Sequence, residues 1–159
     1  GPDKGLIYLL QAWRKLNYHD AVLVLGGKDS QSEWANHLCQ RFGGGIIVQT
    51  GWLDDVSKFY DAIFLYVQPS ATEGFGCEVL EAMAHGRPVL CSDAAGAADC
   101  VLGGGSVVQS ENVEMLAGAI DWYKTHPQPD DNLCREVAKN YTWEIVRQRY
   151  CETWKGLLR

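Results

Sequence analysis

Five apolar runs, most of them ended by glycine, proline or serine, alternate along this chain with segments whose apolar residues recur at helical spacing. The runs are "AVLVLGG" at 21–27, "IIVQTG" at 46–51, "DAIFLYVQPS" at 61–70, "PVLCSD" at 88–93 and "SVVQ" at 106–109. Unbroken apolar strands separated by helices are typical of a parallel sheet that is covered on both faces. The pattern predicts an α/β fold: a Rossmann-like, doubly wound parallel sheet flanked by helices.

The segments between the runs supply the predicted helices. They cover residues 4–17, 32–42, about 54–59 and the stretch after "EGFG", with a short helical turn near Asp99 and helix from about Asn112 onward. Within this last stretch, "NYTWEIVRQRYCETWKGLL" at 140–158 is the final amphipathic helix, for which Thr142 is the expected N-cap. Because a helix opens the chain, we expect the sheet to lack its first strand, which usually lies at the centre of such a sheet.

Length and charge limit the possible classes of protein. With 159 residues the chain is expected to form one domain, 1–159, around a single core. Acidic residues outnumber basic ones by 20 to 14, which disfavours a nucleic-acid partner. No apolar run approaches the roughly 18 residues of a membrane span, so membrane contact is expected to be at most peripheral. The six cysteines form no CxxC pair, which favours reduced, buried thiols and a cytoplasmic location.

The segment "EGFGCEVLE" at 73–81 combines the end of a strand, a glycine-containing loop and the start of a helix. Free N–H groups and the positive end of the helix dipole point the same way there, which makes an anion site. Gly74 and Gly76 allow the backbone to approach a ligand closely. A phosphorylated ligand fits this segment.

Two glutamates flank the loop, and they would repel a bare phosphate. Glu73 and Glu81 make better sense as acceptors of hydrogen bonds from hydroxyl groups on either side of it. A ligand with a diol, then phosphates, then a second polyol satisfies this arrangement. A nucleotide sugar is such a ligand.

At the level of motifs, the chain resembles a known family. The segments "KG", "LVLGG", "VQTGWLDDVSKFYDAIFLYVQPSATEGFGCEVLEAMAHGRPVLCSD" and "YTWE" resemble the C-terminal, donor-binding domain of the retaining glycosyltransferases of family 4, which have the GT-B fold. The resemblance covers nearly the whole chain. It is carried chiefly by the two glutamates with seven residues between them.

The resemblance implies a role for each matching residue. Glu73, the expected catalytic residue, would face the hydroxyls of the transferred sugar, and Glu81 would hold the ribose diol. Lys4 would neutralise the departing diphosphate. The other implied donor-binding residues lie in loops: Gly74, Phe75 and Gly76 beside the sugar and diphosphate, Gly51, Trp52 and Leu53 beside the base, and Gly26 and Gly27 near the nucleotide.

The resemblance also implies partners. The catalytic histidine and the pocket for a sugar, glycan or lipid-linked acceptor belong to an N-terminal domain that is absent from this chain. An arginine that precedes the family's "KG" lysine is absent too, and Asp99 replaces a common glutamate. The implied enzyme is a retaining hexosyltransferase, inactive as this chain alone. Since the sequence has no Asp-x-Asp motif, we expect no essential metal and no cofactor.

Two alternatives remain open from the residues. Glu73 and Glu81 could be the acid and the nucleophile of a glycosidase, although such a pair does not require a phosphate-binding helix start. The chain could also be a nucleotide-binding module without catalysis. Dependence on a nucleotide separates the first alternative from a transferase.

Overall fold

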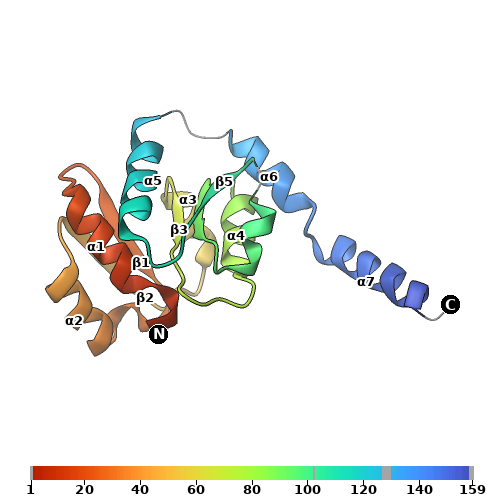
Figure 1. Ribbon diagram of the computed structural model, residues 1–159, viewed down its shortest axis with the longest axis horizontal. Helices are drawn as coiled ribbons and strands as arrows, with labels where there is room; N and C mark the ends of the chain where they lie inside the picture. Colours follow the sequence, from red (N-terminus) through yellow and green to blue (C-terminus); the bar gives the residue numbers. More distant parts are fainter. Residues whose placement is uncertain (1, 102, 127–129, 158–159) are drawn as a thin grey trace.

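The structure is a computed structural model that describes residues 2–101, 103–126 and 130–157 (Figure 1). Five short strands alternate with helices along most of its length. The strands are β1 (Val22–Gly26), β2 (Ile46–Gly51), β3 (Tyr66–Gln68), β4 (Val89–Ser92) and β5 (Gly105–Val108). The α-helices are α1 (Leu6–Leu16), α2 (Glu33–Phe42), α3 (Val56–Ala62), α4 (Cys77–Ala84), α5 (Val113–Thr125), α6 (Asp131–Lys139) and α7 (Trp143–Leu157). Three 3-10 turns are η1 (Pro2–Lys4), η2 (Lys28–Gln31) and η3 (Gly96–Cys100).

The strands are parallel, as predicted, and they form two separate sheets. β1 pairs with β2, and β4 lies between β3 and β5. Among the described residues no ladder joins β1 to β3, which leaves a gap where the central first strand of a doubly wound sheet would lie. A doubly wound sheet has the strand order 3-2-1-4-5-6, and removal of its first strand leaves a pair and a triplet. The observed order therefore agrees with the predicted sheet without its first strand.

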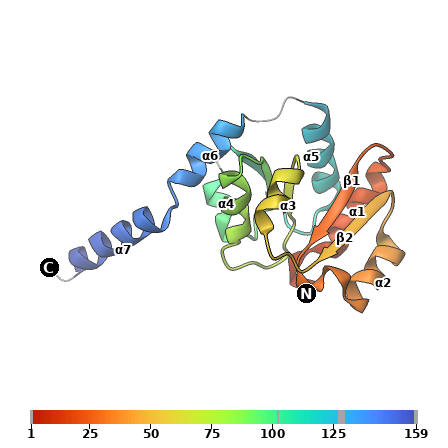
Figure 2. The same cartoon turned by 180° about the vertical axis from the view of Figure 1, so that it is seen from behind.

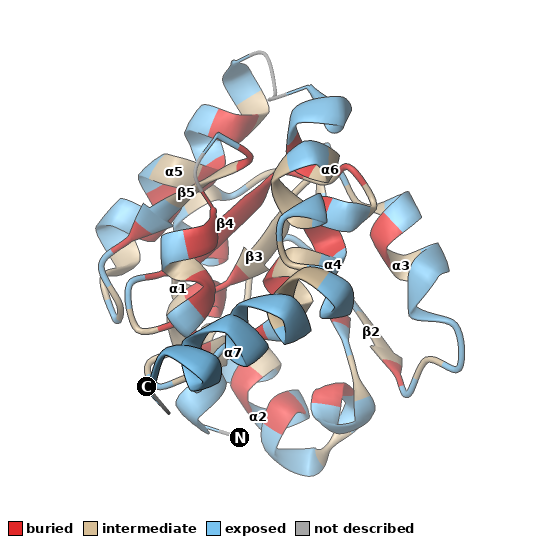
Figure 3. Ribbon diagram, turned by 90° about the vertical axis from the view of Figure 1, so that its right-hand side faces the viewer, coloured by how far each residue is buried: buried red, intermediate tan, exposed pale blue. Residues whose placement is uncertain are grey.

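The core lies on both faces of β4. All four residues of this strand are buried, and successive side chains of a strand point to opposite faces. Leu90 packs into a cluster that includes Trp13 of α1 and Ile120 of α5, whereas Val89 and Cys91 belong to a second cluster with α4, η3 and α6. Figure 3 shows the buried residues concentrated around β4. The layers predicted from the sequence, helices on two faces of a sheet, are confirmed.

The boundaries differ most around α3. The sequence predicts a helix at about 54–59 and a strand over 61–70, but the helix continues to Ala62 and β3 covers only Tyr66–Gln68. Asp55 is the reason for the late start of the helix, because its carboxylate accepts a hydrogen bond from the Ser57 N–H at 3.1 Å and so caps it. The helix then includes the first two residues of the predicted strand.

The C-terminal helix α7 projects from the rest of the molecule (Figures 1 and 2). It contains no buried residue, and Trp143 and Trp154 are 84% and 67% exposed. The Ile145 N–H lies 3.5 Å from Thr142 Oγ1, at the expected cap. None of the described helices, α7 included, combines the length and apolar character needed to cross a membrane.

Candidate functional site

Most of the predicted site residues lie at the carboxyl ends of β1 and β2 or in the segments that follow β1, β2 and β3. Parallel strands all end at the same edge, so the loops after β1, β2 and β3 are neighbours there. Gly26 pairs with Gly51 across the first ladder, and the Gly27 N–H donates to the Gly51 carbonyl at 3.1 Å. The structure thus brings together the three glycines that were predicted from the ends of β1 and β2.

The loop 69–76 after β3 is held by the N-terminal turn η1. The N–H groups of Ala71 and Thr72 both donate to the Asp3 carbonyl, at 2.8 and 3.2 Å. Gly5 has a left-handed backbone (φ 69°), and a Cβ atom at this position would lie 1.8 Å from the Pro69 carbonyl oxygen. Only glycine permits this approach. The close contact places Lys4 beside the loop that carries Glu73.

Four groups donate hydrogen bonds to the Glu73 carboxylate. Oε2 accepts from Lys4 Nζ at 2.5 Å, Gln68 Nε2 at 3.2 Å and Ser70 Oγ at 3.3 Å, and Oε1 accepts from the Gly74 N–H at 3.2 Å. The Glu73 side chain is 13% exposed. Burial raises the pKa of Glu73, but the hydrogen bond and the positive charge of Lys4 outweigh it and hold that pKa below its ordinary value. Glu73 is therefore an oriented, ionised carboxylate.

The helix α4 begins at an open N-terminus. Its N-cap, Gly76, has φ 84°, and no side chain caps the helix. A Cβ at Gly76 would lie 2.5 Å from Gln68 Nε2, whereas a Cβ at Gly74 would meet nothing within 4 Å. The Phe75 carbonyl accepts a 2.7 Å hydrogen bond from the Ala97 N–H of η3, which fixes the loop. Free space beside Gly74 and an uncapped helix start suit an anion.

Glu81 lies on the exposed side of α4, and its partner comes from α3. The Tyr60 hydroxyl donates to Glu81 Oε2 at 2.9 Å, although Tyr60 as a whole is only 4% exposed. Burial, together with the hydrogen bond to Glu81, raises the pKa of Tyr60, so the hydroxyl stays protonated and remains a donor. Phe59, next to Tyr60, borders Gly26, since a Cβ at Gly26 would lie 3.0 Å from its ring.

Two predicted residues lie apart from the glutamates. Trp52 is 71% exposed, and its indole N–H donates to Asp54 at 3.0 Å. Leu53 follows in the same loop and is partly buried. No hydrogen bond between described residues joins this loop to Glu73 or Glu81.

Sequence reasoning missed three residues that contact the glutamates: Tyr60, Gln68 and Ser70. Gln68 and Ser70 are 5% and 0% exposed. The signal for Gln68 was present, because a polar residue at the end of a buried apolar strand needs a hydrogen-bond partner. Tyr60 carried no such signal, since its partner lies on another helix.

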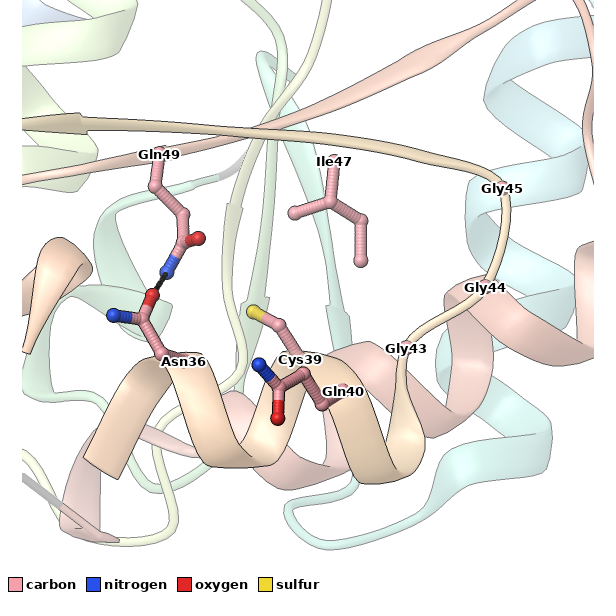
Figure 4. A pocket seen from close by; sticks show the side chains of 8 residues that line it. All are labelled: Asn36, Cys39, Gln40, Gly43, Gly44, Gly45, Ile47 and Gln49. Atoms are coloured by element: carbon pink, nitrogen blue, oxygen red, sulfur yellow. Dashed lines mark hydrogen bonds between the residues drawn. The ribbon is translucent and has the colours of Figure 1, made fainter. Parts of the chain in front are cut away.

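An open depression of about 420 Å³ lies elsewhere, between α2 and β2 (Figure 4). Its polar lining consists of amide side chains, with Gln49 donating to Asn36 at 2.9 Å, and one thiol, Cys39. Burial raises the pKa of Cys39, which keeps the thiol protonated. No charged side chain lines this depression, so the loops around Glu73 and Glu81 are the better candidate for chemistry.

The family of this chain follows from its similarity to known proteins. Residues 1–125 match the family model "Glycosyl transferases group 1". The chain is similar to a lipopolysaccharide core biosynthesis mannosyltransferase of Rhizobium leguminosarum bv. viciae, with 38% identity over 118 residues, which cover 70% of this chain and 34% of the relative.

Solved structures show the same fold. Sucrose-phosphate synthase from Thermosynechococcus elongatus has a TM-score of 0.82 and 26% identity, over 99% of this chain and 43% of that one. The Anabaena protein HepE, in complex with UDP and glucose, has a TM-score of 0.77 and 22% identity, over 98% of this chain and 45% of that one. The chain thus spans less than half the length of these three proteins. It has the Rossmann-like fold of the C-terminal half of GT-B glycosyltransferases, and it belongs to the family of glycosyl transferases group 1.

Proposed function

We propose that this chain is the donor-binding half of a retaining hexosyltransferase. It binds a nucleoside-diphosphate sugar, and together with an N-terminal acceptor domain it transfers the sugar to a sugar, glycan or lipid-linked acceptor. One observation carries the proposal. Two carboxylates flank an uncapped helix start, and a lysine ammonium is bonded to one of them. This arrangement matches a ligand with hydroxyl groups on both sides of a diphosphate.

Each group has a role in the proposal. Glu81 accepts hydrogen bonds from the ribose diol, and the backbone from Gly74 to Gly76 with the start of α4 binds the diphosphate. The Lys4 ammonium has three N–H donors, and after one goes to Glu73 the others are available to neutralise the leaving diphosphate. Gly26, Gly27, Gly51 and Leu53 border the nucleoside, and Phe75 borders the sugar.

Glu73 acts as a positioning and stabilising carboxylate. Three donors, from Lys4, Gln68 and Ser70, bond to Oε2, whereas Oε1 accepts only from the Gly74 N–H and has capacity left to accept a hydrogen bond from a sugar hydroxyl. Retention of the anomeric configuration is what the family resemblance implies, and without a covalent intermediate it requires the acceptor to attack from the face that the leaving group departs from.

The comparisons support the proposal in two ways. One relative is a mannosyltransferase of lipopolysaccharide core biosynthesis, and one protein with this fold was solved in complex with UDP and glucose. The share of each relative that the chain spans leaves room for an acceptor domain.

The proposal assigns no metal or other cofactor, because Lys4 and the start of α4 supply positive charge. Magnesium added during a nucleotide titration should leave the affinity unchanged. We also infer a cytoplasmic location, which is supported by the six cysteines being free thiols. Contrary to the sequence prediction, not all of these thiols are buried, since Cys77 and Cys151 are exposed.

Calorimetry with uridine, guanosine and adenosine diphosphates tests the proposal. One of them should bind, and Glu81→Ala should weaken binding by at least about 10-fold, since a carboxylate hydrogen bond contributes about 1.5–3 kcal/mol. Glu73→Ala should retain most of the nucleoside diphosphate affinity and lose transfer in a protein that includes the acceptor domain. Glu114→Ala, which removes an exposed carboxylate of α5, is the matched control.

Two results would contradict the proposal. The first is that none of the three diphosphates binds. The second is hydrolysis of a plain glycoside in the absence of any nucleotide, which would favour the glycosidase alternative.

A further inference from the structure

We propose that Tyr60, Tyr66 and Gln68 form one positioning network that holds the carboxylates of Glu73 and Glu81 at a fixed separation. This inference rests on the proposed function and deepens it. Tyr60 donates a hydrogen bond to Glu81, and Gln68 donates one to Glu73. The network predicts which side chains set the preference for ribose and which set the preference for the sugar.

The first branch ends at Glu81. Tyr60 is 4% exposed and donates to Glu81 Oε2 at 2.9 Å. Its ring is tilted against His85, with centroids 5.3 Å apart, and contacts Phe59 edge-on at 5.7 Å. The ring is therefore enclosed by its neighbours, and only its hydroxyl reaches the Glu81 carboxylate.

The second branch ends at Glu73. The Tyr66 hydroxyl donates to Gln68 Oε1 at 3.2 Å, and Gln68 Nε2 donates to Glu73 Oε2 at 3.2 Å. Gln68 is 5% exposed, and Gly76 leaves just enough room for its amide, since a Cβ there would lie 2.5 Å from Nε2. The amide is thus confined between a tyrosine and the backbone at the start of α4.

The two branches meet at the tyrosines. The rings of Tyr60 and Tyr66 contact each other edge-on, with centroids 5.8 Å apart and an angle of 72° between their planes. Edge-on aromatic pairs are a favoured and stiff arrangement. Tyr60 belongs to α3 and Tyr66 to β3, so the network ties the two glutamates to different elements of the fold.

The branches predict separate effects on binding. Loss of the Tyr60 hydroxyl should loosen Glu81 and reduce recognition of the ribose diol. Loss of the Tyr66 hydroxyl, or of the Gln68 amide, should loosen Glu73 and reduce recognition of the sugar. A residue that serves only packing would reduce both, or neither.

Calorimetry with three probes measures both preferences. The ratio of the affinities for uridine diphosphate and its 2′,3′-dideoxy analogue measures the preference for the ribose hydroxyls. The ratio of the affinities for UDP-glucose and uridine diphosphate measures the preference for the sugar. The corresponding guanosine compounds and GDP-mannose are measured in parallel. Tyr60→Phe should reduce the ribose preference several-fold and leave the sugar preference unchanged. Tyr66→Phe and Gln68→Met should reduce the sugar preference several-fold and leave the ribose preference unchanged. Tyr18→Phe, which removes a hydroxyl bonded to Asp121 at 2.6 Å, is the control for loss of a tyrosine hydroxyl.

A measurement without ligand separates this inference from the proposed function. The carboxyl carbon resonance of Glu81 in the free protein should shift in Tyr60→Phe, and that of Glu73 in Gln68→Met, but neither should shift in Tyr18→Phe. If Glu81→Gln abolishes the ribose preference and Tyr60→Phe does not alter it, the network is refuted and the proposed function stands. If no nucleotide binds, the proposed function fails, and unshifted resonances would refute the network as well.

Discussion

Lys4 and Glu73 are 69 residues apart in the sequence, and in the fold the Lys4 ammonium donates a 2.5 Å hydrogen bond to the Glu73 carboxylate. The hydrogen bond and the attraction to Glu73 outweigh partial burial and raise the pKa of Lys4, while the pKa of Glu73 is lowered. The pair thus joins the N-terminal turn to the centre of the candidate site.

Lys4→Gln should destabilise the chain modestly at neutral pH. Lys4 is 55% exposed, so the loss should be about 0.5 kcal/mol in the free energy of unfolding. Because the folded pKa of Glu73 lies below its unfolded value, the stabilisation is present above the ordinary value of 4.5 and is lost as the pH falls through the lowered pKa. Denaturant unfolding of parent and variant from pH 7 to pH 2 measures this, and a difference that grew on acidification would contradict it.

Gly76→Ala and Gly74→Ala should separate folding from binding. At Gly76 the positive φ and the 2.5 Å approach to Gln68 make alanine costly, by about 1–3 kcal/mol. At Gly74 a Cβ meets nothing within 4 Å, so stability should change by less than about 0.5 kcal/mol. If the loop binds the diphosphate, Gly74→Ala should still weaken nucleotide affinity by calorimetry. Equal melting temperatures for the two variants would show that the loop geometry is wrong.

Gly5→Ala should be among the most damaging single changes. Both the left-handed backbone and the 1.8 Å approach to the Pro69 carbonyl exclude a side chain. The N-terminal turn would have to leave the loop after β3, and the two hydrogen bonds to the Asp3 carbonyl would break. Thermal unfolding should show a loss of about 2 kcal/mol or more. The control is Gly118→Ala, at an open position within α5, which should be neutral or stabilising.

Trp154→Glu on α7 should barely affect stability, within about 0.5 kcal/mol, because the side chain is 67% exposed. Leu90→Ala on β4 is the contrasting change. Leu90 is fully buried, so its truncation should cost about 2–5 kcal/mol. Chemical denaturation of both variants compares them, and a large loss for Trp154→Glu would mean that α7 packs against the body.

Much of the fold follows from local pattern. The apolar runs predicted all five strands, and the helical spacing predicted the helices between them, because burial on both faces leaves a clear signature. The division into two sheets agrees with the expected absence of the first strand, which would lie between β1 and β3. The boundaries of β3 were also missed. The helix that Asp55 caps continues to Ala62, so it takes the first two residues of the apolar run that predicted the strand.

The sequence proposes the residues of the candidate site but not the contacts that hold them. Glu73, Gly74, Gly76 and Glu81 stand in one motif, which the structure divides between the loop after β3 and the helix α4. The contacts of Asp3 and Tyr60 with this motif come from other elements of the chain, through a backbone carbonyl and a side-chain hydroxyl. Such contacts cannot be predicted from the local sequence pattern.

The position of Gly76 between the two glutamates has a consequence for insertions and deletions. Glu73 lies in a loop before Gly76, whereas Glu81 lies on the helix after it. One extra residue in the loop would strain the hydrogen bonds that hold it but would leave the direction of Glu81 on the helix unchanged. One extra residue in α4 between Gly76 and Glu81 would turn Glu81 by about 100° around the helix axis, away from Tyr60. The number of residues between Gly76 and Glu81 should therefore tolerate insertions and deletions far less than the number between Gln68 and Glu73.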